Sequence, residues 1–178
     1  MPTPVGHALA GLAIGWFSEA MGKKNAAPIR RPALGRLTLA CIAAAVVADA
    51  DILFGQHRTY SHSIGAVFLA GVIAWLIARR RGHRPVAIAF TIAVAYATHL
   101  LLDWLARDTA PPLGLMALWP FSSRFYVSGA NLFFEVSRRY WKADEFILGN
   151  LKAIGWEIVM LAPVAAFVWW IRSTSFDA

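Results

Sequence analysis

The sequence predicts an all-α fold: an integral membrane bundle of about five hydrophobic segments, with a further helix in the membrane interface. Of its 178 residues, 58% are hydrophobic and only 15% are charged, whereas a soluble domain carries about 25% charged residues. Long apolar runs alternate with short polar links. Basic residues gather in these links, as they do in membrane proteins.

One membrane domain over residues 1–178 is expected from the chain length. Its first segment contains Gly6, Gly11 and Gly15, which would let a neighbouring helix approach closely. The single cysteine, Cys41, excludes an intrachain disulfide and a thiolate metal site. We place the hydrophobic segments at residues 5–21, 34–54, 61–78, 86–106 and 151–171.

The region 107–149 is too long for a plain connector between two spans. From residue 131 to 151, apolar and charged side chains mix at a near-helical spacing. This pattern is typical of a helix that lies in the membrane interface. The sequence therefore predicts an outer-face region at 107–149 that contains the interfacial helix.

The basic links predict the orientation of the bundle. The link 22–36 contains five basic residues and the link 79–84 contains four, so we expect both on the cytoplasmic side. The link 55–60 and the region 107–149 then lie outside. The net charge of +7 suits anionic lipid, and without a nucleic-acid motif we expect no nucleic-acid partner. The oligomeric state stays open.

Ionisable side chains collect at one end of this predicted bundle. Successive segments run in opposite directions, so the start of the first, the end of the second, the start of the third and the end of the fourth share one face. An ionisable residue at membrane depth is by default a functional residue. The set comprises His7, Asp49, Asp51, His57, Arg58, His62, His99 and Asp103.

The chemistry of this set indicates a metal site. His99 and Asp103 are four residues apart and share a helix face. Asp49 and Asp51 lie about 200° apart on an ideal helix, so both point inward only if the helix loosens. We favour Asp51 as a ligand, with Asp49 a ligand or the partner of a ligating histidine. With His7 and His62, such a sulfur-free set suits zinc first, and manganese or non-haem iron next.

These motifs resemble a known family. Asp-x-Asp at 49–51, His-Arg-x-x-Ser-His-Ser at 57–63, His-Leu-Leu-Leu-Asp at 99–103 and Trp-Pro-Phe at 119–121 are similar to the YdjM-like family. Its members are described as LexA-regulated, membrane-bound, metal-dependent hydrolases. The resemblance covers His7 to Tyr126 and implies a multi-pass protein of the bacterial inner membrane with a divalent metal.

A weaker similarity links the same residues to zinc-dependent phospholipase C and P1-type nucleases. Asp51, His62, His99 and Asp103 follow the order of their ligands, with His7 as a further candidate. The later His-x-x-x-Glu half of that pattern is missing from this chain. A full three-metal site is therefore not expected.

Together these observations predict a metal-dependent hydrolase that cleaves an ester or phosphoester of a lipid or lipid-linked substrate at the outer face. Arg58 would hold a phosphate oxygen, and His57 would protonate the leaving group. The alternatives are a metal transporter or sensor, or a metal that only stabilises the bundle. Transport is less favoured, because the inner halves of the second to fourth segments are apolar.

Overall fold

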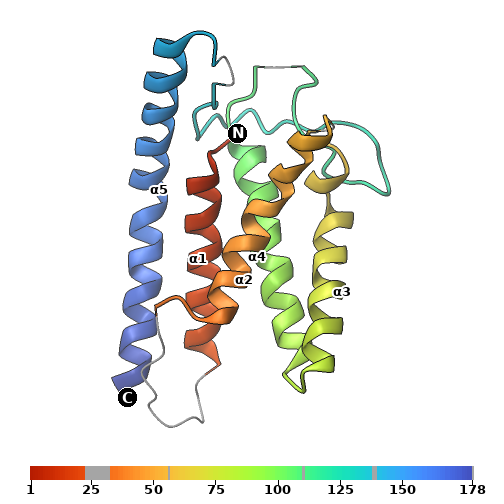
Figure 1. The fold of residues 1–178 in the computed structure, drawn as a ribbon, viewed down its shortest axis with the longest axis vertical. Helices are drawn as coiled ribbons and strands as arrows, with labels where there is room; N and C mark the ends of the chain where they lie inside the picture. The colour runs from red at the N-terminus through yellow and green to blue at the C-terminus, as the bar shows by residue number, and fades with distance from the viewer. Residues whose placement is uncertain (23–32, 56, 110, 138–139, 178) are drawn as a thin grey trace.

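The computed structural model describes residues 1–22, 33–55, 57–109, 111–137 and 140–177 (Figure 1). These residues form five α-helices and two 3-10 helices, which confirms the all-α class. The α-helices are α1 (Pro4–Met21), α2 (Arg36–Val46), α3 (Ile64–Arg80), α4 (Pro85–Leu105) and α5 (Ala143–Asp177), and the 3-10 helices are η1 (Val47–Phe54) and η2 (Tyr60–His62).

Helix α4 holds the bundle together, because it packs against α1, α2 and α3. Helix α5 packs along α1 on one side of the molecule, and α3 stands on the opposite side (Figure 1). Between α2 and α4 the core consists of small and aliphatic side chains, among them Cys41, Ala44, Ile92 and Ala95. An apolar layer thus fills the middle of the bundle.

Two glycines let α1 and α2 touch backbone to backbone. A Cβ atom on Gly11 would lie 2.6 Å from the Cys41 carbonyl oxygen, and one on Gly15 would lie 2.7 Å from Thr38 Cα. Both distances are shorter than a real Cβ contact allows. The close approach expected from the glycines of this segment is therefore confirmed.

Two buried carboxylates tie α1 to the rest of the bundle, one at each end of the helix. Glu157 of α5 accepts hydrogen bonds from the backbone N–H groups of Thr3 (2.7 Å) and Gly6 (3.1 Å). At the other end, Glu19 accepts from the Thr38 hydroxyl and pairs with the Arg172 guanidinium, each at 2.9 Å. The sequence did not reveal either network.

The number of spans differs from the five expected. Among the described residues, two helices are long and apolar enough to cross a membrane, Pro85–Leu105 and Ala143–Ser175. Helix α3 has only 17 residues, and the segment at 34–54 divides into an 11-residue α-helix and the 3-10 helix η1. The polar residues His7 and Glu19 lower the hydropathy of α1.

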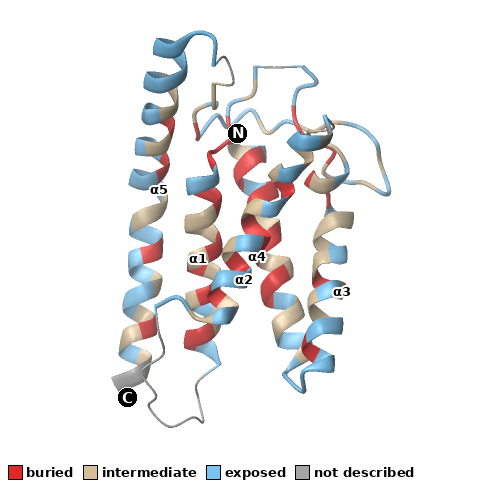
Figure 2. Ribbon diagram, in the orientation of Figure 1, coloured by how far each residue is buried: buried red, intermediate tan, exposed pale blue. Residues whose placement is uncertain are grey.

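Large apolar side chains nevertheless cover the outside of the short helices as well. Phe68 on α3 is 74% exposed and Leu39 on α2 is 50% exposed. Figure 2 shows that the exposed residues lie on the outer faces of the helices. Such an apolar outer surface is suited to contact with lipid.

The prediction of a separate interfacial helix at 131–151 is wrong. Residues 111–137 run without helix across one end of the bundle, with single bridges from Ala106 to Phe133 and from Leu115 to Tyr126 (Figure 1). Helix α5 begins at Ala143 and continues through the expected fifth segment, 35 residues in all, or about 52 Å. The basic residues at 23–31 and 138–139 lie outside the described part of the chain.

We predict that Gly11→Ala lowers the free energy of unfolding by about 1–3 kcal/mol, because the added methyl group overlaps the α2 backbone. Denaturant unfolding of the detergent-purified protein measures this change. Gly155→Ala is the matched control, since nothing lies within 4 Å of a Cβ at that position of α5. Equal stability of the two variants would contradict the close α1–α2 contact.

Candidate metal centre

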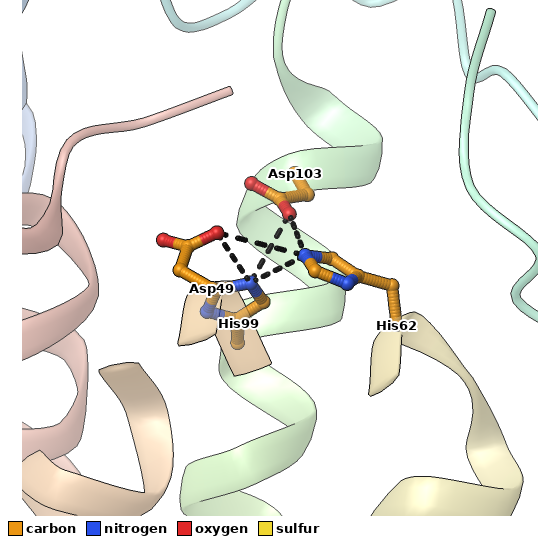
Figure 3. Close-up of side chains that lie close together, drawn as sticks. All are labelled: Asp49, His62, His99 and Asp103. Atoms are coloured by element: carbon orange, nitrogen blue, oxygen red, sulfur yellow. Dashed lines mark hydrogen bonds and ion pairs between the residues drawn. The ribbon is translucent and has the colours of Figure 1, made fainter. Parts of the chain in front are cut away.

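Four elements deliver polar side chains to one end of the bundle. His7 comes from the first turn of α1, Asp49 from η1, His62 from η2, and His99 with Asp103 from the last turns of α4. The three histidine side chains are fully buried. Figure 3 shows four of these residues pointing toward one another from three directions.

Four ligand atoms converge on one point, all within 4.8 Å of one another. The Nε2 atoms of His62 and His99 are 3.0 Å apart. Asp103 Oδ2 lies 3.2 Å from both of them. Asp49 Oδ1 completes the group at 3.7 Å from His62 and 3.6 Å from His99.

The outer ring nitrogens fix the tautomers of both histidines. Nδ1 of His99 donates to the Ala45 carbonyl oxygen at 2.7 Å. Nδ1 of His62 lies 3.1 Å from Asp51 Oδ2 and 2.9 Å from the Ser61 hydroxyl. A neutral imidazole has one N–H, so a neutral ring that donates through Nδ1 directs a lone pair of Nε2 toward the centre. The 3.0 Å contact between the two Nε2 atoms then needs a proton or a cation between them.

A cation fits this arrangement of acceptors. Among the described residues, Asp49 Oδ1 and both carboxylate oxygens of Asp103 are buried without a hydrogen-bond partner. Two imidazole lone pairs and two carboxylates in one buried space are costly unless a positive charge lies between them. The His/Asp cluster could therefore hold a divalent metal ion, and its donor set suits zinc, manganese or iron.

His7 approaches the same carboxylates from the opposite side. Its Nε2 atom lies 3.4 Å from Asp103 Oδ1 and 4.0 Å from Asp49 Oδ2, the oxygens not used by the first group. Its ring stacks on His99 with 3.8 Å between centroids. Neither ring nitrogen has a hydrogen-bond partner among the described residues, so His7 offers a donor for a second ion position.

Asp51, which the sequence favoured as a ligand, lies on the outer side of His62. Its carboxylate accepts hydrogen bonds from Ser61 Oγ (2.5 Å) and the Arg58 backbone N–H (3.2 Å). It also lies 2.8 Å from His57 Nδ1. Asp51, His57 and His62 thus form a second group of metal-type ligands that shares the His62 ring with the first.

Two residues that the sequence analysis missed surround the outer link. Asp108 binds the Arg58 guanidinium at 2.5 Å, and it could have been found as the next carboxylate after Asp103. The Met1 side chain lies against His57 and Arg58, with its Sδ atom 2.8 Å and 3.1 Å from their nitrogens. Burial lowers the pKa of the Met1 amino group, and the nearby Asp103 carboxylate opposes this shift.

Comparison with known proteins gives one finding. The sequence matches the family described as YdjM inner membrane protein over residues 1–175. No curated protein and no solved structure matches the chain. The family match covers nearly the whole chain and confirms the resemblance derived from the motifs.

We predict that the detergent-purified protein binds about one or two equivalents of a divalent transition metal, and that the double variant His99→Ala, Asp103→Ala binds none. Elemental analysis measures both. His83→Ala is the control, because this exposed histidine lies in the link between α3 and α4. A folded wild type without metal after reconstitution would identify the cluster as a polar network only.

Proposed function

Because the chain belongs to the YdjM inner membrane protein family, we propose that it is a membrane-embedded metal-dependent hydrolase. Its substrate is an ester or phosphoester of a lipid or lipid-linked molecule, bound at the outer face of the membrane. One observation carries the proposal: ligand atoms of Asp49, His62, His99 and Asp103 lie within 4.8 Å of one another, and the buried carboxylate oxygens among them have no hydrogen-bond partner in the described part of the chain. A divalent ion held there supplies Lewis acidity and activates water at neutral pH.

The residues around the ligands orient them. The Ala45 carbonyl and the Asp51 carboxylate hold the outer nitrogens of His99 and His62. Such partners fix the tautomer and raise the basicity of a ligating imidazole. We therefore assign Asp49 to the ligands and Asp51 to the orienting groups, which reverses the preference drawn from the sequence.

His57 and Arg58 have the chemistry to act on a substrate at the outer side of the centre. Asp51 Oδ1 lies beside His57 Nδ1, which lets the ring carry a proton for a leaving group. The Arg58 guanidinium donates to Asp108 and to the Pro112 carbonyl oxygen. In this proposal a phosphate oxygen of the bound substrate accepts hydrogen bonds from some of the Arg58 N–H groups.

The outer-face location follows from the basic links on the other side of the bundle. The last turn of α3 and the link after it contain Arg79, Arg80, Arg81 and Arg84, at the end opposite to the cluster. Short loops rich in arginine and lysine are cytoplasmic. The cluster, at the ends where α2 and α4 finish, then faces outward.

A resident metal without catalysis is the second candidate function, as a sensor or a transporter. The full burial of His7, His62 and His99 favours it, because a catalytic ion needs a ligand position open to substrate. Transport would also need a polar path through the bundle. The apolar layer around Cys41 and Ile92 lies between the cluster and the buried pair of Glu19 and Arg172 at the other end.

We predict that Asp51→Asn weakens metal binding about 10–100-fold, the usual effect of removing the partner of a ligating histidine. Competition with a chromogenic chelator measures the affinity. Asp108→Asn, which removes the partner of Arg58 and not of a histidine in the cluster, should leave it unchanged. Complete loss of metal in Asp51→Asn would instead make Asp51 a ligand.

We predict that Asp103→Ala abolishes hydrolysis of lipid phosphoesters while the protein stays folded, and that His57→Ala lowers turnover by about 100-fold or more. Phosphate release from mixed micelles measures turnover, and thermal unfolding checks the fold. His83→Ala should keep full activity. Wild-type turnover in Asp103→Ala would exclude a hydrolase centred on this cluster, and metal flux into proteoliposomes that requires His99 would favour transport.

A further inference from the structure

An apolar groove with a volume of about 1350 Å³ runs between α2 and α3, with α4 as its floor. It exceeds the roughly 300–1,000 Å³ of a pocket for a drug-sized ligand. The groove is wide because small residues line its two walls, such as Ala40 and Ala43 on α2 and Ala70 and Ala74 on α3. Helices α2 and α3 both pack on α4 and leave this space between them.

One end of the groove reaches the residues beside the metal centre. Tyr60 and Ser61 line this end. The Ser61 hydroxyl lies 2.9 Å from His62 Nδ1 and donates to Asp51 at 2.5 Å. The Tyr96 hydroxyl, from the floor of the groove, binds the Ser61 carbonyl oxygen at 2.7 Å. Ser61 therefore lines the groove and also contacts His62 and Asp51, so one residue separates the groove from the cluster.

The groove is longer than one leaflet of a bilayer. Along α3 it is lined from Gly65 to Ala78, a rise of about 20 Å in a helix, and it continues to Arg81. One leaflet contributes only about 15 Å of hydrocarbon. A phospholipid chain with its headgroup at the metal end and the usual disorder of a bilayer chain ends near the midplane, and the far part of the groove then stays without that lipid.

The far end of the groove has the character of a membrane boundary. Arg36 and Arg81 line it, and both residues are exposed. Arginine places its aliphatic stem along apolar surface and its charged head in the polar region. A chain that reaches this end therefore crosses most of the hydrocarbon layer while its headgroup stays at the cluster.

We propose that this groove binds the hydrocarbon chain of the substrate, and that the substrate is a polyprenyl phosphate: one phosphate headgroup on a single isoprenoid chain longer than a leaflet. The inference rests on the proposed hydrolase function for the position of the headgroup, beside Ser61 and the metal centre. We infer a long isoprenoid chain from the length of the groove.

The test measures chain-length preference in the detergent-purified, full-length protein. Native mass spectrometry gives the affinities for undecaprenyl phosphate, farnesyl phosphate and dioleoyl phosphatidic acid. We expect the wild type to bind undecaprenyl phosphate about tenfold more tightly than farnesyl phosphate, because only the longer chain fills the far half of the groove.

Ala40→Phe fills that far half and should remove the preference while leaving the affinity for farnesyl phosphate unchanged. Ala40 is exposed to the groove, so the larger side chain does not displace the core. Ile77→Trp, on the facing wall near the same end, tests the same point independently. Ala166→Phe is the matched control, because Ala166 is exposed on α5, away from the groove.

Equal affinities for the two isoprenoids, or a preference that survives both groove variants, would overturn the inference. Tighter binding of phosphatidic acid would overturn the choice of occupant, as would a lipid-free dimer that covers the groove with a second copy of the chain. Turnover by the wild type, measured beside the binding preference, separates the two proposals. If the preference holds and the wild type hydrolyses no phosphoester, the groove assignment stands and the hydrolase function fails.

Discussion

The structure depends above all on the orientation of two imidazole rings. The rings of His62 and His99 are held by their outer nitrogens, so both inner nitrogens direct lone pairs into a buried space that also contains the Asp103 carboxylate. Four acceptors in one place repel each other unless a cation lies between them. The same few contacts thus determine the chemistry of the site and the stability of this end of the bundle.

The change of helix type at Val47 makes these contacts available. In an α-helix the Ala45 carbonyl would bond to the N–H of residue 49. In a 3-10 helix the N–H of residue 49 bonds to the carbonyl three residues back, at residue 46, instead. The Ala45 carbonyl can then accept from His99. The same change brings Asp49 and Asp51 to opposite sides of the His62 ring, although an ideal helix would point one of them away.

The order of the segments alone indicated which end of the bundle would collect the ionisable residues, because that inference requires only that successive segments run in opposite directions. The sequence could not distinguish Asp49 from Asp51, since no side-chain pattern marks where an α-helix tightens. The sequence analysis also missed the Ala45 carbonyl, because every residue has a backbone carbonyl and the residue type does not show which one accepts a hydrogen bond from a side chain. The mixed stretch at 131–151 looked interfacial, yet its last part, from Ala143, belongs to α5, and residues 131–137 form no helix. Local polarity does not reveal where a long helix starts.

Glu157 has a consequence for the order in which the protein is made. This carboxylate binds the backbone of Thr3 and Gly6, just before His7, and it comes from the last helix of the chain. The first turn of α1 therefore gains this anchor only after α5 has been synthesised and inserted. Until then α1 has its contacts with α2 and α4 alone, and the turn that carries His7 lacks the carboxylate that binds its backbone.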